Sequence, residues 1–132
     1  MRYAAILCLI TMEVVAAENV LADYFSALHW VEAEWKVGPI KGKDGELGPL
    51  QIREGFWKDS KVPGRYSDCA DLEYSKRVAI AYYKKWCPMA LEMRDYEIMA
   101  RIHNGGPKGH RRSSTLPYWR KVWTSMLNQR RR

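Results

Sequence analysis

The sequence has only three cysteines and three histidines among its 132 residues. None of them occurs in the C-x-x-C or Cys/His spacing of a zinc site, so no metal and no cofactor is expected. No apolar run approaches the ~20 residues of a membrane-spanning helix. There is no internal repeat, which excludes repeat architectures. The length has room for one domain with one hydrophobic core.

Hydrophobic residues and aromatic residues are well represented, at 47% and 12%, with six Trp and eight Tyr. This composition is typical of a folded domain rather than a disordered chain. The formal net charge is +7, which favours an acidic partner: nucleic acid, an anionic membrane or an anionic wall polymer. Charge alone does not choose among the three.

The N-terminus resembles a signal peptide over residues 1–17. Arg2 gives a positive start, residues 4–12 an apolar run and residues 15–17 a small-residue cleavage site. This pattern predicts a secreted or periplasmic protein whose mature domain covers residues 18–132, including a basic tail of three arginines. An uncleaved N-terminal helix is the alternative.

Cys69 and Cys87 remain after removal of the signal, and an exported protein invites a disulfide between them. However, residues 71–86 between them have the pattern of one helix, about 24 Å long. Cysteines at its two ends cannot easily bring their Cα atoms within the ~7 Å that a disulfide needs. We therefore expect two free thiols.

Apolar residues recur at helical spacing in four segments, which predicts a mainly α fold. Between the first two helices, residues 37–50 hold four glycines and two prolines, so turns or a small hairpin are expected there. Pro88 is expected to end the second helix. The four predicted helices cover residues 20–35, 68 or 71 to 86, 95–103, and 115 or 117 to 126.

Glu32 is the carboxylate that departs from the pattern of the first helix. With Leu21 at 0°, Glu32 falls at about 20°, inside the apolar stripe, whereas Glu34 falls at about 220°, on the polar face. An apolar environment and the negative helix end both disfavour ionisation of Glu32. A protonated glutamate is what a general acid requires. The alternative is a half-buried structural glutamate paired with a lysine or arginine.

Three motifs occur in order: VEA at residues 31–33, GPLQI at 48–52 and ARIHNGGPKG at 100–109. Together they resemble the lysozyme-like superfamily, in particular invertebrate-type lysozymes and small bacterial or phage lytic transglycosylase-like proteins. The resemblance covers about residues 25 to 123. It implies an α+β, lysozyme-like domain, mainly helical, with a short Gly-rich turn or hairpin after the catalytic helix.

The resemblance also implies roles for individual residues. Glu32 matches the catalytic acid, Gln51 a glutamine that lines the cleft, and Asn104 an asparagine that contacts the sugar. Without the resemblance, a turn-stabilising amide is the preferred interpretation for Gln51 and a helix C-cap for Asn104. Further candidates for substrate contact are His103, Trp57, Tyr118 and Trp119; a packing role is the alternative for His103, and a core position for Trp119.

The implied reaction is cleavage of the β-1,4 bond between MurNAc and GlcNAc in peptidoglycan. A muramidase needs a second carboxylate, for which the resemblance points to Asp44, with Glu46 the other candidate. A lytic transglycosylase needs none. The expected partner is the glycan strand and not nucleic acid, since a nucleic-acid- or membrane-binding module explains none of the motifs; a monomer is assumed.

One departure from the family pattern bears on activity. The family has Glu-Ser-Gly at the acid, whereas this chain has Glu32-Ala33-Glu34. Loss of the serine removes a hydrogen-bond partner near the acid. The alternative function is therefore a catalytically inactive protein that binds peptidoglycan or chitin on the same fold.

Overall fold

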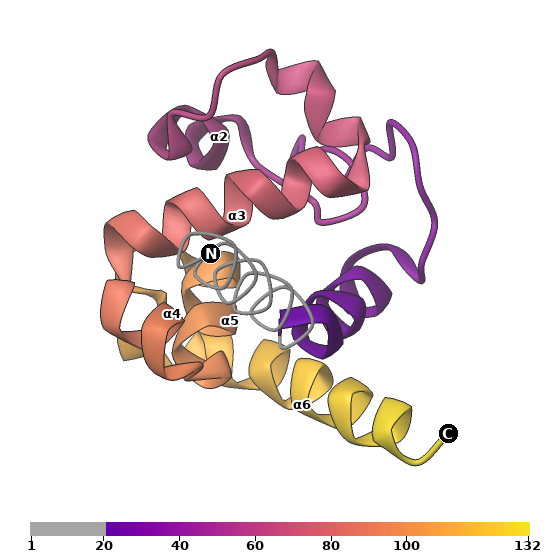
Figure 1. Ribbon diagram of the computed structural model, residues 1–132, viewed down its shortest axis with the longest axis vertical. Coiled ribbons are helices and arrows are strands. Elements are labelled where there is room, and N and C mark those ends of the chain that lie inside the picture. The colour runs from indigo at the N-terminus through magenta and orange to yellow at the C-terminus, as the bar shows by residue number, and fades with distance from the viewer. Residues whose placement is uncertain (1–20) are drawn as a thin grey trace, which may run out of the picture.

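The computed structural model describes residues 21–132, so the expected signal peptide lies outside the described residues. The first helix is helical through residue 33, and eight further helical elements follow it (Figure 1). These are α2 (Glu54–Ser60), η1 (Tyr66–Ala70), α3 (Leu72–Trp86), α4 (Pro88–Met93), α5 (Tyr96–Gly105), η2 (Gly109–Arg111), η3 (Ser113–Thr115) and α6 (Leu116–Arg130).

The mainly α fold expected from the sequence is confirmed. Within the described chain, β pairing is limited to two isolated antiparallel bridges, Lys41 with Leu47 and Leu47 with Ile52. They lie in residues 34–53, here named the loop segment, and form the small hairpin expected after the first helix. No helix in this part of the chain has the length and apolar character to cross a membrane.

Local side-chain chemistry sets several helix ends. Asp71 caps α3 by accepting a hydrogen bond from the Tyr74 backbone, and Asp95 caps α5 through the Ile98 backbone. Pro88 follows the end of α3, as predicted, but it also opens α4, because proline suits the first turn of a helix, where its missing N–H is not needed. The last helix runs to Arg130 rather than to residue 126.

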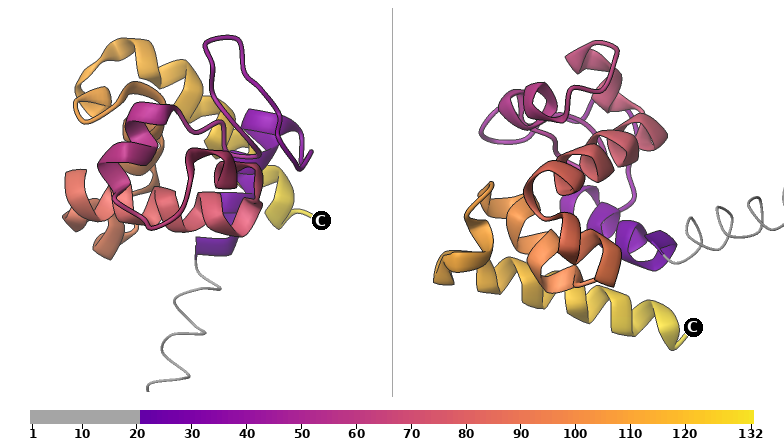
Figure 2. Two further views of the ribbon diagram at one scale, coloured as in Figure 1. Left: turned by 90° about the horizontal axis from the view of Figure 1, so that it is seen from above. Right: turned by 60° about the vertical axis from the view of Figure 1, so that its left-hand side comes forward.

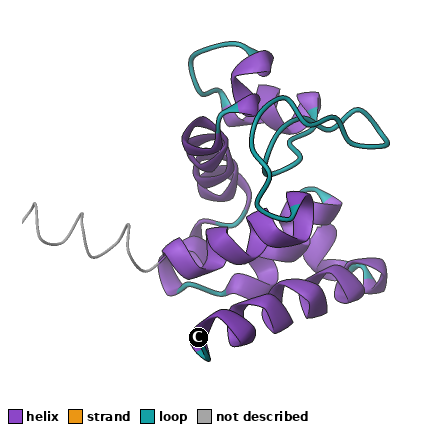
Figure 3. Ribbon diagram, turned by 90° about the vertical axis from the view of Figure 1, so that its right-hand side faces the viewer, coloured by secondary structure: helices purple, strands orange, loops and turns teal. Residues whose placement is uncertain are grey.

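The helices follow one another along the long axis of the molecule, with several of them running across it. α6 lies at one end beside the first helix, while α2 and most of the loop segment lie at the other, with α3 between them (Figures 1 and 2). The teal loops in Figure 3 gather at the end opposite α6. Most of the loop segment thus lies at one end of the molecule, and α6 and the first helix form the other end.

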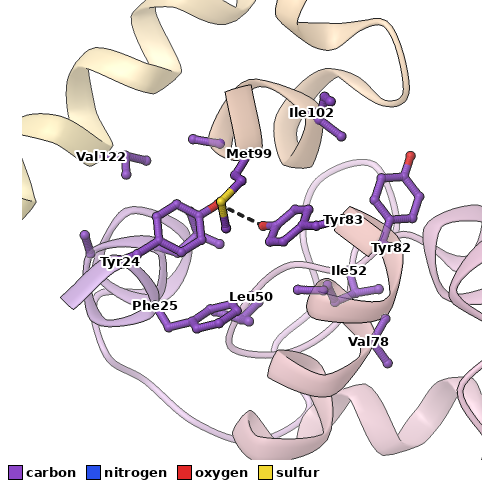
Figure 4. Close-up of a cluster of buried hydrophobic side chains, with 14 of the residues drawn as sticks. Tyr24, Phe25, Leu50, Ile52, Val78, Tyr82, Tyr83, Met99, Ile102 and Val122 are labelled. Atoms are coloured by element: carbon purple, nitrogen blue, oxygen red, sulfur yellow. Dashed lines mark hydrogen bonds between the residues drawn. The ribbon is translucent and has the colours of Figure 1, made fainter. Parts of the chain in front are cut away.

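The hydrophobic core joins the first helix to α3, α5, α6 and the loop segment (Figure 4). Tyr24 and Tyr83 are both fully buried, and their hydroxyls are hydrogen-bonded to each other at 2.8 Å. This bond satisfies two polar groups that would otherwise be costly to bury. Cys69 and Cys87, which flank the two ends of α3, are buried and free, as predicted.

Two motif glycines are required by close backbone approaches. A Cβ on Gly48 would overlap the carbonyl oxygen of Cys69, and a Cβ on Gly109 would overlap the carbonyl oxygen of Arg101. Gly48 also has a φ of 84°, which disfavours any side chain. These contacts dock the loop segment against η1, and the residues after α5 against α5 itself.

Candidate active site

A cavity of about 370 Å³ opens between the first helix, the loop segment and helices α2, α3 and α5. Charged and amide side chains share its wall with an aromatic pair, Phe56 and Tyr82, whose rings stack at 3.6 Å. The residues that line it are Glu32, Lys43, Glu46, Gln51, Arg53, Gly55, Phe56, Tyr82, His103, Asn104 and Gly106. The three motifs of the sequence therefore meet at one cavity.

Glu32 lies in the last turn of the first helix and faces this cavity. Burial raises its pKa to about 7, although the hydrogen bond from Tyr118 works in the opposite direction. The Tyr118 hydroxyl donates to Oε1 of Glu32 at 2.6 Å. Glu34, by contrast, is exposed, so the difference between the two glutamates that helical phase predicts is confirmed.

Glu46 brings a second carboxylate to the same cavity. Its Oε2 accepts a hydrogen bond from the Asp44 backbone at 2.9 Å, and its Oε1 lies 3.6 Å from the Arg53 guanidinium. Partial burial pulls the pKa of Glu46 upward, but the backbone N–H donors and Arg53 outweigh it, so the pKa lies below its usual value. The negative charge of Glu46 in turn raises the pKa of Glu32.

Asp44 lies elsewhere in the loop segment. It is exposed and is not among the residues that line the cavity. Its backbone N–H donates a hydrogen bond to the Glu46 carboxylate, while its own side chain is exposed. Of the two carboxylates considered from the sequence, Glu46 shares the cavity with Glu32.

Gln51 combines the two roles considered for it. Its Nε2 donates to the carbonyls of Ile40, at 3.2 Å, and Gly48, at 2.9 Å. These two hydrogen bonds hold separate parts of the loop segment together. The same side chain lines the cavity. Since both amide hydrogens are used, only its oxygen is available to accept a hydrogen bond from a ligand.

His103 also lines the cavity, but both of its ring nitrogens have protein partners. Nε2 lies 3.0 Å from the carbonyl oxygen of Leu50, and Nδ1 lies 2.9 Å from the Tyr83 hydroxyl. A carbonyl only accepts, so Nε2 carries the hydrogen and Nδ1 accepts from Tyr83. Burial lowers the pKa of His103 to about 4. A neutral histidine thus ties α5 to the GPLQI turn, the packing alternative of the sequence analysis.

Asn104 follows His103 and lines the cavity from the last turn of α5. The helix C-cap is Gly106, with a φ of 81°, so the C-cap alternative for Asn104 is wrong. No hydrogen bond within residues 21–132 occupies the Asn104 side chain, which leaves its amide free to meet a ligand.

The other aromatic candidates lie around the site rather than in it. The Trp57 indole donates to the Tyr74 hydroxyl at 2.9 Å and fixes α2 on α3. Tyr118 reaches the site through its bond to Glu32, and Trp119 packs against the core. Phe56, Tyr82 and Arg53 line the cavity but are not among the residues predicted from the sequence. The adjacent aromatic residues Phe56 and Trp57 are the available signal for Phe56.

The described residues contain no group of three or more His, Cys, Asp or Glu side chains that could hold a metal ion. The cavity brings together one carboxyl with a raised pKa, Glu32, and one with a lowered pKa, Glu46, with amides and an aromatic wall beside them. Pairs of carboxyl groups whose pKa values are pushed apart are typical of glycoside-cleaving sites. The fold and the site together define a lysozyme-like class of protein.

Comparisons with known proteins point the same way, although no family model matches the chain. A lysozyme of Magallana gigas is 42% identical over 77 residues, which cover 57% of this chain and 56% of that protein. The invertebrate-type lysozyme 6 of Caenorhabditis elegans is 35% identical over 88 residues, covering 57% and 63%. The chain therefore spans about half to two thirds of the length of these curated relatives.

Among solved structures, Meretrix lusoria lysozyme in complex with Aeromonas hydrophila PliI is similar in fold. It superposes with a TM-score of 0.65 at 28% identity, over 76% of this chain and 86% of that chain. The resemblance to the lysozyme-like superfamily, and within it to invertebrate-type lysozymes, is thereby confirmed, as is the lysozyme-like, mainly α fold.

Proposed function

We propose that this chain is a muramidase that hydrolyses the β-1,4 MurNAc–GlcNAc bond of peptidoglycan, with Glu32 as general acid. The observation that carries the proposal is the environment of Glu32, whose pKa is raised to about 7 by burial on the wall of an open cavity. Such a carboxyl is protonated at the pH where it must protonate the leaving glycosidic oxygen. Relatives named lysozyme support the substrate class.

Glu46 is proposed as the second carboxylate, in preference to Asp44. It lines the cavity with Glu32, and its pKa is held below the usual value. An ionised carboxylate there stabilises the positive charge that develops on the sugar ring in the transition state. Asp44 then acts as a positioning residue, through the backbone N–H that orients Glu46.

The remaining residues of the cavity have roles in binding. The Asn104 amide and the Gln51 oxygen can hydrogen-bond sugar hydroxyls and N-acetyl groups. The stacked Phe56 and Tyr82 rings offer an apolar wall to a sugar face, and Lys43 and Arg53 offer positive charge to the carboxylates of the polymer. His103, Trp57 and Tyr118 contribute by holding this arrangement in place.

The departure at Ala33 does not leave Glu32 without a partner. Tyr118 on α6 donates the hydrogen bond that orients the carboxyl, which supports an active enzyme over the inactive binding protein. We further propose that the protein is exported by its residues 1–17 to a secreted or periplasmic location and acts as a monomer on glycan strands, without nucleic acid as a partner.

Digestion of purified peptidoglycan by the wild-type chain and by Glu32→Gln tests the acid. We expect a ~10²–10⁴-fold loss of rate in Glu32→Gln, because an amide cannot act as the general acid and general acids contribute about that factor. Mass spectrometry of the products distinguishes reducing-end muropeptides, expected here, from the anhydro-muropeptides of a lytic transglycosylase. Equal rates would remove Glu32 from the mechanism, and no cleavage by either chain would favour the inactive binding protein.

The paired variants Glu46→Gln and Asp44→Asn test the second carboxylate. We expect Glu46→Gln to lose roughly 10²-fold in kcat/KM, because it removes the charge beside the reacting sugar, while Asp44→Asn loses less than about 3-fold, since its backbone N–H remains. The reverse order of losses would return the role to Asp44.

A further inference from the structure

A second cavity, of about 480 Å³, lies between the C-terminal part of the first helix and α6, which run side by side (Figures 1 and 2). It is lined on one side by Trp30, Val31 and Glu34. No residue lines both this cavity and the candidate active site. On the first helix, Trp30 and Glu32 are about 160° apart, so they face in nearly opposite directions.

Two exposed tryptophans form the aromatic wall of this second cavity and its margin. Trp30 and Trp35 are each 42% exposed, and their rings lie 4.8 Å apart. The Trp35 indole donates to the Ser26 carbonyl at 3.1 Å, which holds it against the first helix. A smaller cavity, lined by both indoles and by Asn128 and Arg132, adjoins this second cavity and shares Trp30 and Asn128 with it. The combined surface between the first helix and α6 is named here the Trp30 groove.

The α6 side of the groove is polar. Thr124, Ser125 and Asn128 present hydroxyl and amide groups to the groove; Asn128 follows the other two at spacings of four and three residues, which place side chains on one face of a helix. Within residues 21–132 no hydrogen bond engages the side chain of Asn128, and the Ser125 hydroxyl accepts one from Gln129. An indole wall opposite hydroxyl and amide groups is a combination that suits a sugar ring, which has an apolar face and polar edges.

The charge of the groove is positive. Arg120 and Lys121 line the larger cavity and Arg132 the smaller, against the single carboxylate of Glu34. None of these three cations forms an ion pair within the described chain, so their charges are available to a ligand. Exposed, unpaired cations favour an anionic ligand and speed its association.

We propose that the Trp30 groove is a second, non-catalytic binding site for a carboxylate-bearing glycan strand. The identification of this strand as peptidoglycan rests on the proposed function. The residues of the groove by themselves favour an anionic glycan. Its hydroxyl and amide lining favours a saccharide over a membrane surface, which binds an apolar face. A strand held in the groove leaves the catalytic cavity free, so the enzyme stays on an insoluble polymer between cleavages.

The experiment compares Trp30→Ala with Trp123→Ala, both in the Glu32→Gln chain so that the ligand is not consumed. Trp123 is the matched control, because it is a tryptophan of α6 that is also 42% exposed and lies outside the groove. The probe is a soluble, uncross-linked peptidoglycan strand with free carboxylates. Binding is measured by titration, and its location by the shifts of the indole N–H signals in nuclear magnetic resonance spectra.

We expect the Trp30 indole signal to shift on titration, and Trp30→Ala to bind about tenfold more weakly than Trp123→Ala, a difference of ~1.4 kcal/mol. Arg120→Gln is expected to weaken binding about threefold and to reduce its dependence on salt. Amidation of the strand's carboxylates should reproduce that loss. Equal affinity in the two tryptophan variants would overturn the proposal, as would binding of anionic lipid vesicles with no binding of strands.

Cleavage by the chain with native Glu32 separates this proposal from the proposed function. If Trp30→Ala slows digestion of insoluble sacculi while short soluble fragments are cleaved at the wild-type rate, both stand. Trp30-dependent binding without any cleavage would support the groove and overturn the proposed muramidase. Cleavage of sacculi that is unaffected by Trp30→Ala, with unchanged binding, would overturn the groove alone.

Discussion

The first helix and the loop segment after it meet at the same cavity but are specified in different ways. The helix places Glu32 by regular phase, since its apolar residues and the acid share one face. The loop segment places Glu46 through positive φ angles at Gly45 and Gly48 and through side-chain hydrogen bonds to the backbone, such as those of Gln51. A regular element thus positions Glu32, and an irregular one positions the Glu46 carboxylate beside it.

The largest expected effect is a loss of folding free energy caused by a substitution in the loop segment, with the first helix unchanged. Gly48→Ala should destabilise the fold by more than about 3 kcal/mol, because a Cβ there overlaps the Cys69 carbonyl at an unfavourable φ. Gly45→Ala is the matched control: its φ of 86° is nearly the same, but nothing lies within 4 Å of its Cβ. We expect it to cost about 1 kcal/mol. Thermal and urea unfolding measure both, and equal losses would contradict the close-approach argument.

The next effect concerns the burial of Glu32 in the helix. Its folded pKa of about 7 lies above the unfolded value of 4.5, so its ionisation opposes folding as pH rises from about 4.5 through 7. Glu32→Gln should therefore stabilise the protein at pH 8, by on the order of 2 kcal/mol, and change little at pH 4. Unfolding in urea at both values of pH tests this. Glu34→Gln, at an exposed site, should leave stability unchanged at both.

The smallest effect sharpens the link between the helix and α6. The Tyr118 hydroxyl lowers the pKa of Glu32 by donating a hydrogen bond to it. Tyr118→Phe should therefore raise the pKa of Glu32 and move the alkaline limb of kcat/KM, which reports loss of the acid's proton, to higher pH by less than about one unit. A purely structural role for Tyr118 would lower the rate at all pH values and leave the limb where it is.

The longer helices could be predicted from the sequence, and the short ones could not. Apolar residues at helical spacing marked the first helix, α3, α5 and α6. α2 has only seven residues and buries none of them completely, so it is too short to show an apolar stripe at helical spacing. α4 has six residues and begins at Pro88, which was interpreted only as a stop.

The site was predicted in part. The prediction that Glu32 is less exposed than Glu34 is confirmed, because one helix fixes the phase of its own residues. The identity of the second carboxylate depends on the path of the loop segment, and two residues in one turn, Asp44 and Glu46, point to different places. Tyr118 is 86 positions from Glu32 in the sequence. No local pattern in the sequence indicates that its hydroxyl contacts the Glu32 carboxyl.

The sequence by itself determined a mainly helical domain, an environment of Glu32 that disfavours its ionisation, and the glycine-bearing motifs that surround it. Local periodicity and backbone preference depend on only a few neighbouring residues, so they can be identified from the sequence. Only the tertiary structure decided that Glu46 shares the cavity with Glu32, that His103 is a neutral tie between α5 and Leu50, and that Trp30 faces a groove with α6. Those facts depend on contacts between segments distant in the chain, whose pairing is fixed by packing and not by local propensity.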